Sequence, residues 1–292
     1  MARLRVIGRV VVDYVRQMVD HDVPGLAAEL AYRFMFATFP FVIFIAALAG
    51  FIANWLGIHD LSGRIIDSIG RELPADLVGP IKAQLEAVLA HTDPQLLSLG
   101  AVLALYAAAG GTNTLMKAMN RAYSVPESRS LPLRIALAVL LTVLAGAAIV
   151  VSFVVIVGGT VATKRVIDEI GLGGIWSTLS LLRWPAAFAL LVAAVAALLR
   201  YAPSVRTPWR WSAVSAVAFA VVWLVVTYAF GVYVARFATF DATYGALASA
   251  VVLMLWFYLS SFILLCAAEL AALLIRLGVP ESGLPDSGSL PV

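Results

Sequence analysis

The feature that most constrains this chain is a series of six long intervals that contain no Asp, Glu, Lys or Arg. A helix needs about 20 apolar residues to cross the hydrocarbon core of a bilayer. Composition points the same way, because 62% of the residues are hydrophobic and 13% are charged, against about 25% charged in an average soluble domain. The mean hydropathy is +0.97. These values exclude a disordered, fibrous or ordinary soluble protein and indicate a polytopic membrane protein.

We therefore predict an all-α fold, a transmembrane bundle of six helices within residues 24–277. The six predicted spans are residues 34–57, 95–116, 135–162, 179–200, 211–235 and 242–268. The fourth apolar interval is the shortest, but Arg183 and Arg200 flank it and its helix can begin upstream, near Ile175.

The distribution of Lys and Arg predicts the orientation of the bundle. Basic residues gather in the N-terminal segment and in the second and fourth loops, and such loops stay in the cytoplasm. Both termini are therefore expected to be cytoplasmic. Residues 57–94 become a long outer loop with short surface helices, and residues 278–292, rich in Pro, Gly and Ser, a disordered tail.

Residues 1–23 form a separate cytoplasmic segment. Within it, residues 4–19 have a helical period, with an apolar face that includes Tyr14 and a charged face that includes Arg16. The pattern fits an amphipathic helix on the membrane surface, or equally a helix packed against the cytoplasmic end of the bundle. Asp22 is predicted to cap the next helix, with Pro24 in its first turn.

The residues that could bind metals are sparse. Cys266 is the single cysteine, and the three histidines, His21, His59 and His91, lie far apart in the sequence. No metal-ligand spacing and no phosphate-binding GxxxxGK[ST] loop is present. Cys266 lies in an apolar run and is interpreted as a small hydrophobic residue. We predict no metal, no cofactor and no enzymatic activity.

Polar residues inside or at the mouth of a bundle are the default functional candidates in a membrane protein. The first group is Glu29, Tyr32, Arg33 and Pro40. Glu29 and Arg33 are four residues apart and can pair on one helical face. Pro40 should kink its helix and free backbone groups that could line a cavity. The alternative is an ordinary kink with both charges at the headgroups.

The second group is Asn113, Lys117, Asn120, Arg121 and Tyr123. The first four gather on one side of a helix that leaves the membrane. These residues would meet anionic headgroups or the acids Glu29 and Glu269. The alternative is simple anchoring by positive charge on the cytoplasmic side.

The remaining candidates lie toward the C-terminus. Tyr244 is in the short outer turn with Arg236 and Asp241, where an ion pair would close a helical hairpin. Trp256, Tyr258 and Glu269 are in the last span, and Glu269 falls at its cytoplasmic end, where it could snorkel. The sequence also allows a charged network of Glu29, Arg33, Arg121 and Glu269. This network would either lock the helices together or act as a gate.

Three of these segments also carry a family resemblance. They are Ala27-Ala28-Glu29-Leu30-Ala31-Tyr32 leading to Phe39-Pro40, then Asn120-Arg121-Ala122-Tyr123, then Tyr244-Gly245-Ala246-Leu247-Ala248 with Trp256 and Ala268-Glu269. In this order and spacing the chain resembles the YihY/BrkB family over most of its length. It departs from the family where Ala37-Thr38 replaces a frequent Ser, and where Ala267 replaces a frequent Gly.

The resemblance implies a bacterial inner-membrane protein with six helices and an undefined activity. Members are labelled as virulence factors, as transporters or as ribonuclease BN. We expect transport or lipid handling, with membrane lipids as partners and a small solute or a lipid as substrate. The alternative is a scaffold or envelope-integrity factor that transports nothing. Ribonuclease activity is disfavoured and no nucleic acid is expected, because metal ligands are not clustered. A homo-oligomer is open but not indicated.

Overall fold

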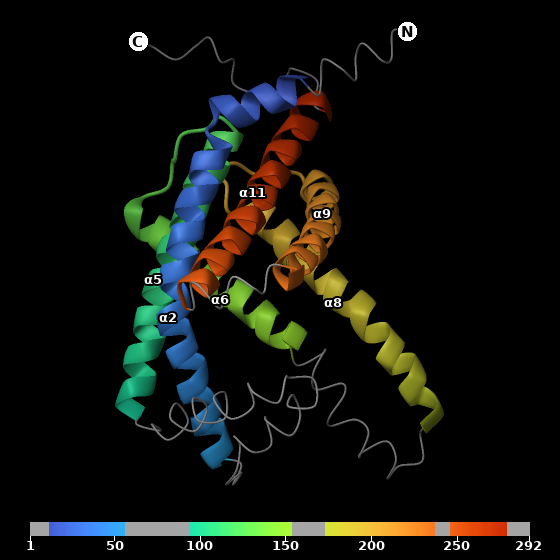
Figure 1. Ribbon diagram of the computed structural model, residues 1–292. Coiled ribbons are helices and arrows are strands. Elements are labelled where there is room, and N and C mark those ends of the chain that lie inside the picture. Colours follow the sequence, from blue (N-terminus) through green and yellow to red (C-terminus); the bar gives the residue numbers. More distant parts are fainter. Residues whose placement is uncertain (1–11, 56–93, 154–172, 237–245, 279–292) are drawn as a thin grey trace. The chain divides into compact units, whose positions relative to one another are not determined.

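The computed structural model describes residues 12–55, 94–153, 173–236 and 246–278, and every regular element among them is a helix. Residues 12–20 form a short helical segment. Six long helices follow, labelled in Figure 1: α2 (Val23–Trp55), α5 (Pro94–Ala122), α6 (Leu131–Phe153), α8 (Gly173–Tyr201), α9 (Trp209–Arg236) and α11 (Ala246–Gly278). The prediction of an all-α fold is confirmed for the described residues.

Four of these helices contain segments long and apolar enough to cross a membrane. The segments are Leu131–Ala148, Trp184–Tyr201, Trp209–Val234 and Ser249–Leu277. Large apolar side chains on them, such as Leu144, Val225 and Val251, are exposed. Exposed apolar side chains in this number suit hydrocarbon and not water. Membrane crossing by α2 and α5 stays a prediction.

The start of α2 is fixed by its cap. The Gly25 amide donates a hydrogen bond to Oδ1 of Asp22, with an N···O distance of 3.3 Å. Gly25 leaves room for this carboxylate, since a Cβ there would lie 2.5 Å from Asp22 Oδ2. Asp22 itself has a φ of 54°, which is uncommon for a residue with a side chain. The predicted cap is confirmed, and the helix begins well before the predicted span at residue 34.

Two other helix ends bear on the predictions. Helix α8 begins at Gly173, so its predicted upstream extension is confirmed. Helix α11 runs on to Gly278, beyond the predicted end at residue 268. Its added turns bury Ala271 and Ala272, so this end of the helix packs against protein. The predicted outer loop, the C-terminal tail and residues 4–11 lie largely or wholly outside the described residues.

The chain divides into two compact units, which are described separately. The first unit consists of Met1–Tyr32 and Thr112–Val292. Within it, α9 packs against both α8 and α11, and α8 packs against α6. Its buried residues are mostly small or flexible, including Ala27, Met116 and Ala268, which lets helix backbones approach closely.

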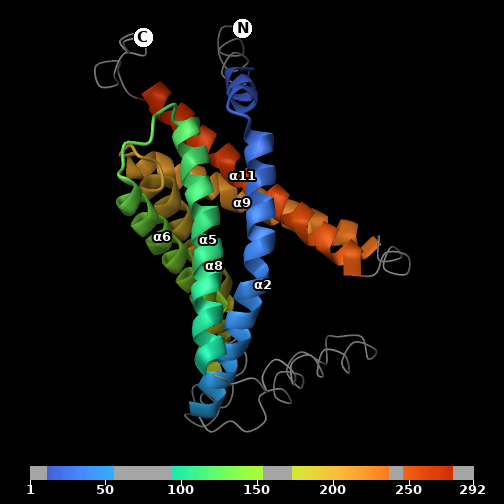
Figure 2. The same ribbon diagram turned by 90° about the vertical axis from the view of Figure 1, so that its left-hand side faces the viewer.

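The second unit is Arg33–Gly111, in which parts of α2 and α5 lie side by side (Figure 2). Gly111 permits this approach, because a Cβ there would lie 3.0 Å from a ring carbon of Phe34. In this unit the Thr38 hydroxyl donates to the Phe34 carbonyl at 2.8 Å. Helix α2 continues through Pro40. The predicted kink at this proline stays a prediction.

Candidate functional site

The most deeply buried charged side chain among the described residues is Glu269, on α11, with 1% of its surface exposed. Its Oε1 lies 2.6 Å from Nδ1 of His21. His21 sits in the turn between residues 12–20 and α2, where its amide donates to the Gln17 carbonyl. The cap at Asp22 fixes the conformation of this turn. The turn in this conformation places the imidazole of His21 next to Glu269 on α11.

Two further polar residues extend this pair. His21 Nε2 lies 3.5 Å from the hydroxyl oxygen of Ser124, in the turn after α5. Arg276 follows Glu269 by two turns of α11 and donates a hydrogen bond to the same hydroxyl at 3.0 Å. Ser124 has a φ of 54°, so its backbone is held in an uncommon conformation at this point. Side chains from three separate segments therefore meet at this end of α11.

Two tyrosines complete the group. The Tyr14 hydroxyl donates to the backbone carbonyl of Cys266, one turn before Glu269, at 2.7 Å. The Tyr123 hydroxyl is buried and has no hydrogen-bond partner within the described residues. Burial raises the pKa of both phenols above the ordinary value, and the negative charge of Glu269 raises it further. We call the set Glu269, His21, Ser124, Arg276, Tyr14 and Tyr123 the Glu269 cluster.

The Glu269 cluster is incompletely hydrogen-bonded. Oε2 of Glu269 is buried without a partner in the part of the chain that is described, as is the Tyr123 hydroxyl. A buried polar atom without a partner costs about 1–3 kcal/mol, and more when it is charged. A histidine–carboxylate pair can also hold a proton on either member. The arrangement can therefore accept a hydrogen bond from a bound group or store a proton. Across the described ranges no three potential metal ligands gather.

Glu269 has two expected partners, Arg33 and Arg121. Arg33 belongs to the second unit, so its pairing with Glu269 stays a prediction, and only Arg121 lies in the same unit as Glu269. Arg121 is exposed on α5, and His21 occupies the position beside the carboxylate. Of the alternatives left open for Glu269, the structure does not favour snorkelling, because α11 continues past this residue and its side chain is buried. The reason is the length of α11, which the apolar interval in the sequence understates.

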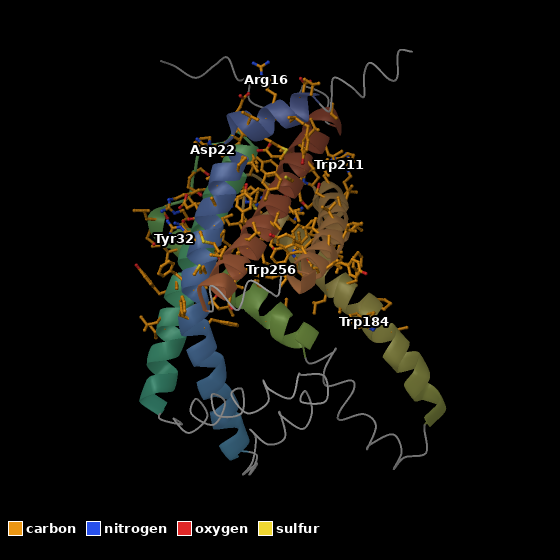
Figure 3. All side chains as sticks on the ribbon, in the orientation of Figure 1. Arg16, Asp22, Tyr32, Trp184, Trp211 and Trp256 are labelled. Atoms are coloured by element: carbon orange, nitrogen blue, oxygen red, sulfur yellow. The ribbon has the colours of Figure 1, made fainter. Side chains whose placement is uncertain are left out.

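Glu29 and Tyr32 lie on the exposed side of α2 within the first unit. The carboxylate of Glu29 accepts a hydrogen bond from the Thr114 hydroxyl on α5 at 3.2 Å. Tyr32 is labelled in Figure 3. Arg33 belongs to the second unit, where its guanidinium lies 3.7 Å from the Cβ position of Gly110. The functional roles predicted for these residues, and for Pro40, stay predictions.

The group on α5 separates into different environments. Lys117 and Arg121 are exposed. Asn113 is half-buried, and its Oδ1 has no partner among the described residues. Asn120 is buried, with 4% of its surface exposed. The structure thus distinguishes the one member that is held inside the protein from those that face outward.

Asn120 connects two loops. Its Nδ2 donates to Oε2 of Glu127 at 2.8 Å, and its Oδ1 accepts from the Ser204 amide at 2.7 Å. In the same place the Arg129 guanidinium donates to the carbonyls of Tyr201, Ala202 and Pro203. We call Asn120, Glu127, Arg129 and Ser204 the loop clamp. It joins the loop after α5 to the turn between α8 and α9.

Trp256 belongs to an aromatic group between α9 and α11 and is labelled in Figure 3. Its ring lies edge-on to Trp223, with 6.1 Å between the ring centroids. Trp223 stacks with Phe219 and donates to the Ser260 hydroxyl at 3.0 Å. These contacts explain the residue by packing between the two helices. Tyr244 and Asp241 lie outside the described residues.

Sequence reasoning missed His21, Tyr14, Ser124 and Arg276 as neighbours of Glu269. His21 was considered only as a metal ligand, and no second histidine stands at helical spacing from it. Its partner lies 248 residues away in the chain, so local spacing carries no signal of the contact. The one local hint is Asp22, whose cap fixes the direction of the turn that holds His21.

The described residues form helices, four of which are long and apolar enough to cross a membrane, and a buried carboxylate lies near the end of α11. A family model described as "Virulence factor BrkB" matches residues 14–289. The chain therefore belongs to the BrkB family, and the resemblance drawn from the sequence is confirmed.

Two relatives are similar to this chain over most of its length. It is 31% identical over 267 residues to the "Putative ribonuclease-like protein YfkH" of Bacillus subtilis (strain 168), covering 91% of this chain and 94% of that protein. It is 28% identical over 266 residues to the "UPF0761 membrane protein RSc1559" of Ralstonia nicotianae, covering 89% of this chain and 57% of that protein. No solved structure matches this chain.

Proposed function

We propose that this chain handles a lipid or a small solute in the bacterial inner membrane, with the Glu269 cluster as its polar site. One observation carries the proposal: a buried carboxylate that keeps one oxygen without a partner in the described part of the chain. Ionisable side chains within membrane-spanning segments are costly and are usually retained for function. This oxygen, Oε2 of Glu269, can accept a hydrogen bond from a substrate group or can bind a proton.

The proposal includes the topology predicted from the sequence. Six helices cross the membrane, α2 and α5 among them, and both termini lie in the cytoplasm. The Glu269 cluster then lies at the cytoplasmic end of α11. Accessibility labelling tests this topology: single cysteines introduced at Arg16 and Arg121 into a Cys266→Ala chain should react only with reagents that reach the cytoplasm. Labelling from the outer side would refute it.

A ribonuclease role is not part of the proposal, although one relative carries a ribonuclease-like name. Hydrolysis of a phosphodiester ordinarily uses clustered metal ligands or a positioned acid–base pair. His21 and Glu269 are bonded to each other and enclosed, which suits a proton or a small ligand better than an RNA strand.

The test compares bound molecules in three variants by native mass spectrometry of the full chain in lipid nanodiscs. Glu269→Gln keeps the shape of the side chain and removes its charge, and His21→Gln removes the imidazole. Asp20→Asn is the matched control, since Asp20 is exposed and pairs with Arg16 at the surface. A discrete lipid or solute retained by the wild type and the control, and lost from both cluster variants, is the expected result.

Retention of only bulk lipid, unchanged by Glu269→Gln or His21→Gln, would contradict the proposal. The cluster would then be structural, and a membrane scaffold that transports nothing would become the better description. Glu29→Gln and Arg121→Ala, measured in parallel, would decide whether the other predicted candidates take part.

A further inference from the structure

The turn between α8 and α9 carries a concentration of positive charge. Arg200 lies in the last turn of α8, Arg206 lies in the turn between the helices, and Arg210 is in the first turn of α9. No Asp or Glu occurs anywhere in α8, the turn or α9. Arg206 and Arg210 are exposed, and neither has a carboxylate partner among the described residues. We call residues 200–211 the basic turn.

Aromatic rings support the guanidinium groups of the basic turn. The Arg200 guanidinium carbon lies 5.6 Å from the ring centroid of Tyr201 and 5.8 Å from that of Trp209. The Arg210 guanidinium lies 4.8 Å from the ring centroid of Trp211, a residue labelled on α9 in Figure 3. Tyr201 and Trp209 are 52% and 51% exposed. Cation–π contacts of this length hold the guanidinium groups against the rings.

The backbone of the basic turn is held by the loop clamp. Three of its carbonyls accept hydrogen bonds from Arg129. Arg200 itself donates to the Thr207 carbonyl at 2.6 Å, so its charge is partly used inside the turn. The acid of the clamp, Glu127, already accepts hydrogen bonds from Asn120 and from the Arg129 amide. The exposed side chains of Arg206 and Arg210 are therefore carried by a backbone that hydrogen bonds hold in place.

The place of the basic turn in the chain decides between partners. It connects two segments that are long and apolar enough to cross a membrane, Trp184–Tyr201 and Trp209–Val234. A short connection between two spans lies at the level of the headgroups, where Trp and Tyr are also favoured. Arginine pairs with phosphate through two parallel hydrogen bonds.

We propose that the basic turn binds the phosphate group of an anionic phospholipid, with Arg206 and Arg210 as its ligands and Tyr201 and Trp209 against the lipid backbone. The surface is separate from the Glu269 cluster, and this inference stands whether or not the function proposed for that cluster is correct. RNA also carries phosphates, but an elongated strand would have to lie along the membrane surface to reach a turn this short.

The test measures which lipids stay with the full chain after transfer from phosphatidylcholine nanodiscs that contain a minor fraction of phosphatidylglycerol. Native mass spectrometry should show phosphatidylglycerol enriched on the wild type. An arginine near an anionic surface contributes about fivefold to binding, so Arg206→Ala with Arg210→Ala should weaken phosphatidylglycerol binding about 25-fold. Arg16→Ala, which removes an exposed arginine elsewhere, should leave the enrichment unchanged.

A second variant separates charge from geometry and guards against misfolding. Arg206→Lys with Arg210→Lys keeps both charges and should give an intermediate loss, because lysine cannot form the paired hydrogen bonds. No enrichment on the wild type, or equal enrichment on wild type and double alanine variant, would overturn the proposal. So would tighter binding of a labelled RNA oligonucleotide that displaces phosphatidylglycerol and depends on the same two arginines.

Discussion

The loop clamp and the Glu269 cluster are both polar groups within one mainly apolar unit, and they differ in how completely they are hydrogen-bonded. In the clamp, both polar atoms of the Asn120 amide have partners. In the cluster, one oxygen of Glu269 and the hydroxyl of Tyr123 have none among the described residues. A saturated network stabilises and positions loops, whereas an unsaturated one retains capacity for a further ligand. Burial alone does not distinguish the two.

The largest expected effect is the loss of the clamp's arginine. Arg129→Ala should reduce the free energy of unfolding by about 3 kcal/mol, since three carbonyls lose a charged donor. Thermal unfolding in detergent measures the change. Arg121→Ala, which removes an exposed arginine on α5, is the matched control and should change stability by less than about 0.5 kcal/mol. Equal effects of the two variants would mean that the clamp does not stabilise the protein.

Asn120 should give the next largest effect. Asn120→Ala leaves the Ser204 amide and Oε2 of Glu127 without partners and should cost about 2 kcal/mol. Asn113→Ala removes an amide whose Oδ1 has no partner in the described residues, so it should cost much less. The same thermal measurement compares them. If Asn113→Ala lowers the stability more than Asn120→Ala does, a fully hydrogen-bonded side-chain amide is not the one that stabilises the protein.

Alkaline pH should weaken the Glu269 cluster in particular. The raised pKa values of Tyr14 and Tyr123 mean that their phenols ionise in the unfolded chain first. Their stabilising contribution is complete below the unfolded pKa of about 10 and falls above it, by up to about 1.4 kcal/mol per pH unit for each tyrosine. The double variant Tyr14→Phe with Tyr123→Phe should show a shallower loss of stability from pH 10 upward. An unchanged slope would indicate that these phenols are not protected.

The smallest effect separates the two tyrosines at neutral pH. Tyr14→Phe removes a hydrogen bond to the Cys266 carbonyl and should cost about 1 kcal/mol. Tyr123→Phe removes a hydroxyl with no partner in the described part of the chain, so it should be neutral or slightly stabilising. Tyr123→Phe could instead lower the stability and abolish binding of the lipid or solute detected by native mass spectrometry. In that case the Tyr123 hydroxyl has a partner, and the partner is that bound molecule.

Much of the architecture could be predicted from the sequence because it is written in local patterns. Uncharged apolar intervals predict the long helices, and Asp22 with Pro24 predicts where α2 begins. Helix ends are less predictable: α11 continues through Glu269 because buried alanines pack that end, which a count of apolar residues cannot show. Glu269 itself is a candidate from the sequence because polar residues inside or at the mouth of a bundle are the default functional candidates.

The contacts of Glu269 and of Arg129 could not be predicted in the same way. His21 and Glu269 are brought together only by the packing of distant segments. Arg129 binds the carbonyls of another loop, and carbonyl groups belong to every residue, so no side-chain pattern identifies them. Identity of residue type predicts what a side chain can do, and long-range packing decides what it meets.

The order in which the ribosome synthesises the chain determines when the contacts between the N-terminal residues and α11 can form. Tyr14 and His21 meet partners that lie 252 and 248 residues later in the chain. Residues 12–20 are synthesised long before α11 exists, so neither contact can form until the last long helix has been made and inserted. The His21–Glu269 pair is therefore a late step of biogenesis. A chain that stops before α11 would leave its first helical segment undocked and visible to quality-control proteases.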